Sequence, residues 1–142
     1  MPRILRLCPA SPPSREVAAF VDGLELPPRP AYRLRLAADE ITANVVLHGY
    51  RGAPGPVELV ADVYNDLAWL RVDDVAPPFD PSRVCGTPRT DLDNGPPGGA
   101  GLVLVRAAVR WLRYERVHGR NRTTLWISRG GPDGTANRTC GQ

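Results

Sequence analysis

The chain contains no lysine, and all 18 of its basic residues are arginine. This absence excludes several classes of enzyme, because a P-loop needs a lysine on its phosphates, a protein-kinase-like fold needs its strand lysine, and Schiff-base enzymes need an amine. Cysteine is scarce as well, since only Cys8, Cys85 and Cys140 are present. These residues lie far apart and form no CxxC pair, so the sequence predicts neither a disulfide framework nor a zinc site, and free thiols in a reducing cytoplasm are the simplest interpretation.

Long apolar runs are also missing from the sequence. No window approaches the roughly 18 apolar residues of a membrane-spanning helix, and the apolar residues around Arg3 and Arg6 are too few for a secretory signal. We therefore expect a cytoplasmic protein without a membrane partner. The formal net charge of +3 is modest for 142 residues, so it does not by itself require a nucleic-acid partner.

The sequence does contain enough apolar material for one hydrophobic core. Of its 142 residues, 42% are apolar and 23% are charged, and this length favours a single domain over two. We expect that domain to cover residues 1–130 and the polar residues 131–142 to form a disordered tail. The 16 prolines cluster between proline-free windows, and regular structure is expected inside those windows.

Hydrophobic periodicity assigns an element to each proline-free window. In the first half of the chain we expect a short edge strand over 3–8, a helix over 15–24 capped by Ser14, and a helix over 31–49 with its C-cap at Gly49. A hairpin with strands over 57–64 and 67–74 should follow. The last elements should be a helix from the glycines at 98–101 to Leu112 and a closing hairpin over 114–118 and 123–128, with its turn at 119–121. Residues 75–97 are rich in proline and show no such period, and a segment of that length indicates a lid or binding loop.

Alternation along the strand over 67–74 predicts a polar group at the end of a buried row. Ala68, Leu70, Val72 and Asp74 share one face of this strand, and Asp73 lies on the other. An acid at a strand end that opens into a loop can accept a hydrogen bond from the exocyclic amine of a bound base. A turn-forming aspartate would explain the same residue, so this pattern alone leaves both hypotheses open.

A second polar group lies on the long predicted helix. Glu40, Asn44 and His48 are spaced four residues apart, so they form one row beside the apolar stripe. A carboxylate and an amide oxygen on successive turns can hold a hydrated hard cation and activate a nucleophile, because magnesium takes oxygen ligands and keeps most of its waters. A polar helix edge, with His48 favoured by the negative end of the helix dipole, would explain the same spacing.

Three glycines, Gly98, Gly99 and Gly101, open the next predicted helix. Glycine there lets the backbone approach an anion, and the free N–H groups of a helix start, together with its dipole, bind phosphate. A dinucleotide-binding Rossmann motif does not fit, because a proline-rich loop precedes these glycines where that motif needs a strand.

The order of these features resembles a known family. The stretches LAADEITANVVLHGY (36–50), VDDVAPPFDP (72–81) and GGAGLVLVRAAV (98–109) resemble the N box and the glycine boxes of the GHKL ATPases and kinases, which share the Bergerat, or histidine-kinase-like ATPase, fold. The PPFDP run, the GGxGLxLxR pattern and the final RYERVHGRNRTTLWI (113–127) are most similar to the anti-sigma-factor serine/threonine-protein kinase branch. The resemblance covers roughly residues 30–129. It implies an α+β two-layer sandwich, in which about three helices cover one face of a mixed, mainly antiparallel sheet, with a flexible ATP lid over about 75–97.

The resemblance also implies roles for individual residues. Glu40 would be the general base that deprotonates an attacking serine, Asn44 would ligate the magnesium ion that bridges the ATP phosphates, and Asp74 would bind the adenine amine. Gly99 and Gly101 would face the phosphates as the lid closes, Thr123 would support the adenine through water, and His48 would have a packing role. The remaining ATP-binding positions would be Ala76, Pro78, Phe79, Gly98 and Leu102.

By this resemblance the chain is an ATP- and magnesium-dependent protein-serine kinase and anti-sigma factor. It would bind a sigma factor and phosphorylate a serine of a STAS-type antagonist, and a homodimer is among the expected assemblies because relatives often form one. One departure is Ala76, which stands where the first glycine box usually has glycine, and its methyl group could crowd the base if that position needs close backbone approach or a positive φ.

Two alternatives follow from the sequence. Ala76 motivates a non-catalytic partner-binding module with a degenerate nucleotide pocket. A nucleic-acid binder would instead use Arg106, Arg110 and Arg113, which are predicted to share one face of the last helix, although arginines at this spacing usually form a solvated face.

Overall fold

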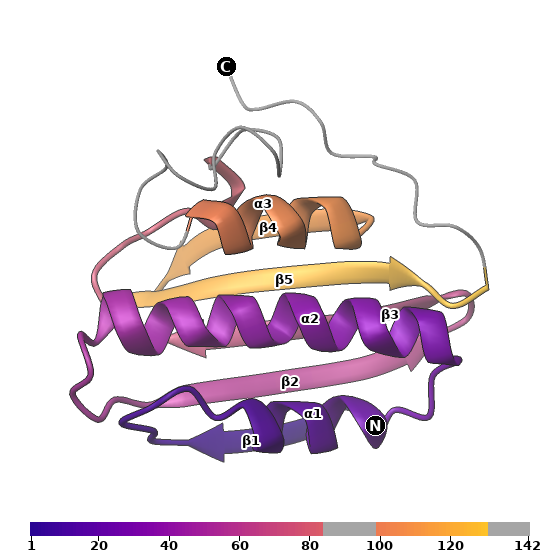
Figure 1. The fold of residues 1–142 in the computed structure, drawn as a ribbon, viewed down its shortest axis with the longest axis horizontal. Coiled ribbons are helices and arrows are strands. Elements are labelled where there is room, and N and C mark those ends of the chain that lie inside the picture. Colours follow the sequence, from indigo (N-terminus) through magenta and orange to yellow (C-terminus); the bar gives the residue numbers. More distant parts are fainter. Residues whose placement is uncertain (84–98, 131–142) are drawn as a thin grey trace.

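The computed structural model describes residues 1–83 and 99–130, which form five strands and three α-helices (Figure 1). The order along the chain is β1 (Arg3–Leu7), α1 (Ser14–Asp22), α2 (Pro28–Asn44), the π-helical turn η1 (Val45–Gly49), β2 (Val57–Tyr64), β3 (Leu67–Asp74), the single helical turn η2 (Pro81–Arg83), α3 (Gly99–Ala108), β4 (Trp111–Val117) and β5 (Arg120–Ser128). The predicted lid beyond Arg83, Gly98, Cys85, Cys140 and the predicted tail lie outside the described residues. Among the helices that are described, none combines the length and the apolar character needed to cross a membrane.

The strands form one five-stranded sheet in the order β1-β2-β3-β5-β4, with β1 at an edge as predicted. All four neighbouring pairs among these described strands are antiparallel, so the expectation of a mixed sheet is wrong for this part of the chain. Tight turns explain the pairing of β2 with β3 and of β4 with β5, because a two-residue connection joins antiparallel strands. The helices lie together on one face of the sheet, which gives the expected α+β two-layer sandwich (Figure 1).

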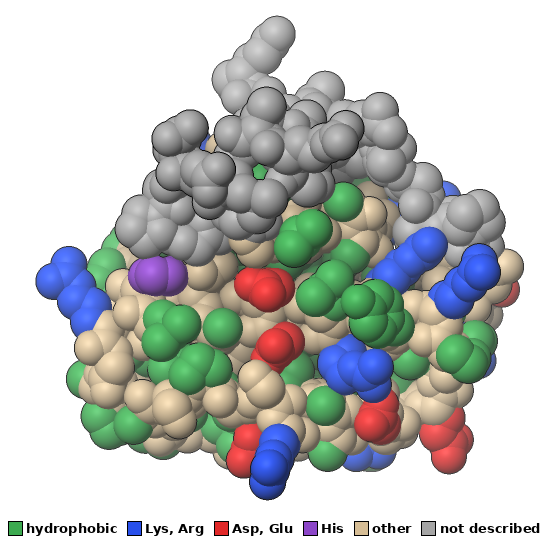
Figure 2. Space-filling view, viewed as in Figure 1, with side chains coloured by type: hydrophobic (Ala, Val, Ile, Leu, Met, Phe, Trp, Pro, Cys, Tyr) green, Lys and Arg blue, Asp and Glu red, His purple; other side chains and the backbone are tan. Residues whose placement is uncertain are grey.

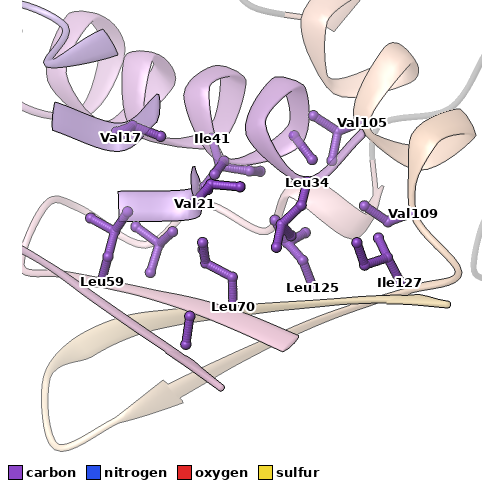
Figure 3. Packing of buried hydrophobic residues seen from close by; sticks show 14 of the residues in the cluster. Val17, Val21, Leu34, Ile41, Leu59, Leu70, Val105, Val109, Leu125 and Ile127 are labelled. Atoms are coloured by element: carbon purple, nitrogen blue, oxygen red, sulfur yellow. The ribbon is translucent and has the colours of Figure 1, made fainter. Parts of the chain in front are cut away.

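The core forms where the apolar sides of the helices meet the inner face of the sheet. Figure 3 shows residues of both layers that point into this space and are at most 3% exposed: Val17, Leu34, Ile41, Leu59, Leu70 and Leu125. Burial of a side chain of this size stabilises a fold by about 1.5–3 kcal/mol. The row predicted on β3 belongs to this core, and its last member, Asp74, is 5% exposed.

The opposite face of the sheet carries none of the described helices and holds the three tryptophans of the chain in one row. Trp69 on β3 is the register partner of Trp126 on β5, which is also the partner of Trp111 on β4. Aromatic cross-strand pairs of this kind contribute about 0.2–1 kcal/mol each. Asp73 lies on this face too, where it forms ion pairs with Arg71 and Arg122 at 3.3 and 3.2 Å. Strand alternation therefore separates Asp73, which holds neighbouring strands together, from Asp74, which faces the helix layer.

Helix boundaries differ from those expected from periodicity. α2 begins at Pro28 rather than at residue 31, because the first turn of a helix tolerates proline. At its other end the helix widens into η1, where the Tyr50 N–H donates to the Val45 carbonyl at 2.8 Å, so the predicted C-cap at Gly49 is wrong. α3 ends at Ala108 and not at Leu112, because the Arg110 N–H bonds to the Trp126 carbonyl at 2.8 Å and the chain has joined the sheet.

Two further local predictions need correction. Ser14 is the first residue of α1, and no side-chain cap forms at this helix start. The turn between β4 and β5 consists of His118 and Gly119, with φ of 49° and 75°, rather than residues 119–121, because two left-handed residues form the tight turn favoured in hairpins. Asn121 therefore belongs to β5, where it is the register partner of Asp74.

The structure also removes the observation that motivated a nucleic-acid binder. α3 ends before Arg110, and Arg113 lies on β4, so these arginines do not share a helix face with Arg106. Arg106 Nη1 donates to the Ser82 carbonyl at 2.7 Å, and Arg110 Nη1 donates to Ser128 Oγ at 3.0 Å. Figure 2 shows positive and negative side chains interspersed on the helix-covered face, a distribution typical of an ordinary solvated surface.

Candidate functional site

A cavity of about 250 Å³ lies where the C-terminal end of α2 and η1 meet the ends of strands β3 and β5. Its lining residues are Ile41, Asn44, Val45, His48, Gly49, Arg51, Asp74, Ala76, Pro77, Pro78, Phe79, Pro81, Leu102, Asn121 and Thr123. They come from separate stretches of the chain, and most are apolar with a few polar groups among them. This combination is typical of a site for a small organic ligand.

Asp74 ends β3 and presents a carboxylate to this cavity. Its Oδ1 accepts hydrogen bonds from the Ala76 N–H at 2.9 Å and from Asn121 Nδ2 at 2.8 Å. Among the described residues nothing bonds to Oδ2, so one oxygen is left as an acceptor for a ligand. Burial raises the pKa of Asp74, although the bonds from Asn121 and Ala76 and the charge of Arg116 oppose this shift.

Ala76 follows two residues later and causes no backbone strain. It is absent from the residues with positive φ, so the conformation that would favour glycine does not occur there. Its methyl group occupies space beside Gly49, where a Cβ built on the glycine would lie 2.8 Å from the Ala76 Cβ. Because Gly49 has no Cβ, there is room for the methyl group of Ala76.

Asn44, on the last turn of α2, lines the same cavity and has no bonding partner for its amide nitrogen within the described part of the chain. Its Nδ2 is buried without a hydrogen bond. A buried amide that lacks a partner costs about 1–3 kcal/mol, so its presence at a cavity wall fits a polar ligand. An amide oxygen is also the kind of ligand that magnesium accepts. Among the described residues no cluster of His, Cys, Asp or Glu could hold a metal alone, so a metal at Asn44 would take its other ligands from phosphates and water.

Glu40 lies one helical turn before Asn44 and contacts α3. A Cβ built on Gly101 would collide with Glu40 Oε2, so any larger residue at position 101 would require this carboxylate to move. Burial raises the pKa of Glu40, and the neighbouring charge of Asp39 raises it further. A half-buried carboxylate with a raised pKa is a better proton acceptor than an ordinary one, which suits a general base.

The structure brings most of the predicted site residues together. Those that line the cavity are Asn44, Asp74, Ala76, Pro78, Phe79, Leu102 and Thr123. Glu40 and Gly101 lie against each other outside that lining, and Gly99 begins α3. His48 is exposed at the cavity wall, so its expected packing role is wrong, because η1 ends the regular helical spacing before this residue.

Sequence reasoning missed Asn121 and Arg51 among the polar lining residues. The sequence prediction places Asn121 in a turn. Asn121 alternates in phase with Thr123, Leu125 and Ile127, and this phase is the signal that would assign it to the strand. Arg51 follows η1 with a φ of 54°, and no periodicity in the sequence marks it.

The chain belongs to the histidine kinase-like ATPase domain family, whose sequence pattern matches residues 11–129. This confirms the family predicted from the motifs. The chain is also 33% identical over 96 residues to the serine/threonine-protein kinase BtrW of Bordetella bronchiseptica, and the match covers 66% of this chain and 68% of BtrW.

Solved structures show the same fold. The RsbU and RsbW domains of Rv1364c from Mycobacterium tuberculosis superpose with a TM-score of 0.61 at 18% identity, over 89% of this chain and 32% of that one. The histidine kinase domain of a blue-light activated kinase from Erythrobacter litoralis superposes with a TM-score of 0.54 at 17% identity, over 88% of this chain and 64% of that one. At these identities the likeness concerns the fold.

Proposed function

We propose that the chain is an ATP- and magnesium-dependent protein-serine kinase that acts as an anti-sigma regulatory factor. The observation that carries this proposal is the convergence of three polar groups at one end of the sandwich. Within the described part of the chain, Asp74 offers a free acceptor and Asn44 an amide nitrogen without a partner, and Glu40 offers a half-buried carboxylate one turn before Asn44 on α2. Membership of a kinase-like ATPase family and the likeness to BtrW support the same function.

Asp74 would bind the base of the nucleotide. Its free Oδ2 would accept the hydrogen bond of the adenine amine, and Thr123 on the neighbouring strand would support the ring through water. Guanine carries a carbonyl oxygen at the corresponding position and would bring an acceptor against this carboxylate. ATP should therefore bind more tightly than GTP.

Asn44 would hold the magnesium ion through its side-chain oxygen. Bound magnesium would neutralise the phosphate charge that builds up during transfer. Gly99 and Gly101 would lie along the phosphates at the start of α3, where N–H groups of a helix start are free. Gly98, which is outside the described residues, stays a predicted ATP-binding position. Pro78, Phe79, Ala76 and Leu102 would enclose the nucleotide with apolar surface.

Glu40 would act as the general base. Its carboxylate would accept the proton of a substrate serine as the serine oxygen bonds to the γ-phosphorus and the bond to ADP breaks. The raised pKa of Glu40 keeps this carboxylate receptive to a proton. In-line transfer depends on positioning and charge neutralisation more than on covalent catalysis, so a chain without lysine can perform it.

The partners belong to the same proposal. The chain would bind a sigma factor, phosphorylate a serine of a STAS-type antagonist, and form a homodimer. The alternative, a non-catalytic binding module, was motivated by Ala76. Ala76 avoids positive φ and packs beside Gly49, which supports the kinase over this alternative.

Phosphate transfer tests the proposed function. The purified chain should label a STAS-type antagonist from its own genome when supplied with magnesium and γ-labelled ATP, and the label should be on serine. An antagonist with that serine replaced by alanine is the matched control and should stay unlabelled. Binding of ATP without label on any antagonist would contradict the kinase proposal and favour the non-catalytic module.

A further inference from the structure

The buried side chain of Asn121 lies on β5 directly beside Asp74. We propose that Asn121 is a positioning residue that holds Asp74 with Oδ1 turned away and Oδ2 alone facing the cavity, so that nucleotide binding is insensitive to pH across the neutral range. This inference rests on the proposed function, because it concerns how the same cavity would bind ATP.

The surroundings of Asn121 determine which way its amide points. Its Oδ1 accepts from the Tyr114 hydroxyl at 2.5 Å and from Arg116 Nη1 at 2.9 Å. Its Nδ2 donates to Asp74 Oδ1 at 2.8 Å, to the Ala76 carbonyl at 3.0 Å and to the Pro77 carbonyl at 3.3 Å. Arg116 and Tyr114 lie on one side and acceptors on the other, so a flipped amide would set its nitrogen against Arg116 and its oxygen against three acceptors.

This arrangement also fixes the chain that follows Asp74. Arg116 Nη1 donates to the Ala76 carbonyl at 3.1 Å as well as to Asn121. The backbone at residues 76–77 is therefore tied to β4 and β5 through the side chains of Arg116 and Asn121. Loss of the Asn121 amide would release both the carboxylate of Asp74 and one wall of the cavity.

The charged and titratable groups around Asp74 come from every neighbouring element. Arg116 and Tyr114 approach from β4 through Asn121, Tyr50 lies after η1, and His48 and Arg51 line the same cavity. Asp73 precedes Asp74 and points to the other face of the sheet, where Arg71 and Arg122 pair with it. Asn121 itself does not titrate, so its Nδ2 remains a hydrogen-bond donor at any pH.

An Asn121→Asp substitution tests this role because it keeps the shape of the side chain and replaces its donor by a second carboxylate. Arg116 and Tyr114 would favour the ionised form of this new carboxylate, and one proton shared with Asp74 would preserve the bond between the two groups at low pH. As the pH rises the proton leaves, two adjacent carboxylates repel, and Asp74 turns out of position. We expect ATP affinity of this variant to fall by about tenfold or more with rising pH.

In the wild-type chain, ATP affinity should depend on pH in the opposite direction. Its affinity should be constant near neutral pH and should fall only as the pH drops toward the pKa of Asp74, which burial raises. Titration calorimetry with ATP and magnesium over a range of pH measures both profiles. Asn65→Asp is the matched control, since it makes the same change in the exposed turn between β2 and β3.

The outcomes separate the inference from the proposed function. If ATP affinity changes with pH in the same way for wild type and the Asn121→Asp variant, the positioning role is overturned. If wild type does not bind ATP at all, the proposed function and this inference are overturned together. If the Asn121→Asp variant fails to fold, Tyr114→Phe removes only one of the bonds that hold the amide. It should weaken ATP binding severalfold without reversing the pH slope, and unchanged affinity would contradict the inference.

Discussion

Asp74 is a buried carboxylate at the end of a core strand, and its burial opposes ionisation. Two N–H donors partly offset the desolvation, and both bond to the same oxygen. A side chain chosen for stability alone would not leave a desolvated charge here, since a buried carboxylate that lacks partners disfavours the folded state. At the residue scale, this penalty supports the proposed role of Asp74 as a ligand group.

Replacement of Asp74 by asparagine should therefore raise the stability of the fold and weaken nucleotide binding. The Oδ1 of asparagine can accept the same two bonds, while its Nδ2 would present a donor to the adenine amine. Loss of this hydrogen bond should weaken ATP binding by about 1.5–3 kcal/mol, or roughly ten- to a hundredfold.

The stability effect has a defined pH dependence. Because the folded-state pKa of Asp74 is raised above the ordinary value of 3.8, ionisation destabilises the wild-type fold, and the penalty is complete above the folded-state pKa. In urea unfolding, the Asp74→Asn variant should have a larger free energy of unfolding than wild type at neutral pH. This difference should disappear as the pH falls below 3.8, the ordinary pKa of an aspartate. A less stable Asp74→Asn variant at neutral pH would contradict this account.

Gly49 and Ala76 should behave as a coupled pair. A methyl group on Gly49 would meet the Ala76 Cβ, and overpacking of this kind costs about 1–3 kcal/mol. Gly49→Ala should therefore destabilise the fold and weaken ATP binding, whereas Gly49→Ala combined with Ala76→Gly should recover both. Urea unfolding of the four combinations measures the coupling, and additive effects would show that the two positions are independent.

The residues of the site differ in how far the sequence predicts them. Asp74 is predictable because strand alternation is local, and the apolar partners of its row precede it directly. The role of Asn121 depends on its contact with Asp74, 47 residues away in the sequence. The two-residue turn at His118 and Gly119 determines which face of β5 the side chain of Asn121 occupies. Without that turn placed correctly, the side chain of Asn121 is assigned to a loop.

At the scale of elements, the π-helical turn η1 connects the site to the sheet. Tyr50, which follows η1, donates its hydroxyl proton to the Pro56 carbonyl at 2.6 Å and accepts from the Val75 N–H at 2.9 Å. These bonds join the residues beside the paired ends of β2 and β3, where Val57 is the partner of Asp74. The turn thus holds the wall of the cavity against the strand that carries Asp74.

Tyr50→Phe should loosen this connection. It removes two hydrogen bonds, each worth about 1 kcal/mol, so we expect a loss of about 1–2 kcal/mol in unfolding free energy together with weaker ATP binding. Tyr32→Phe is the matched control, because that side chain is 59% exposed on α2. Equal effects of the two substitutions in urea unfolding would contradict the role assigned to Tyr50.

Element types followed from periodicity, whereas some boundaries did not. The change of period from helical to alternating after residue 56 correctly separates helix from hairpin. The end of α2 was misplaced because a π-helical turn continues the helical pattern of apolar residues through Val45 and Val46. The end of α3 was misplaced because Leu112, which suits a helix stripe, packs into the same core from β4.

At the scale of the whole molecule, the two layers meet the needs of the proposed reaction at one end of the sandwich. The sheet contributes Asp74 and Thr123, and the helix layer contributes Glu40, Asn44 and Leu102. Both layers thus contribute binding groups to the cavity, and the helix layer also carries the proposed base. A change of the base should leave nucleotide binding intact, because Glu40 lies outside the lining of the cavity.

The most direct test is the comparison of Glu40→Gln with wild type in ATP binding and in phosphate transfer to a STAS-type antagonist. Glutamine keeps the size of the side chain and cannot take the serine proton, so the account predicts unchanged ATP affinity and a loss of transfer of about a hundredfold or more. Glu16→Gln, which alters an exposed acid in the first turn of α1, should leave both measurements at the wild-type level. Undiminished transfer by the Glu40→Gln variant would contradict the account.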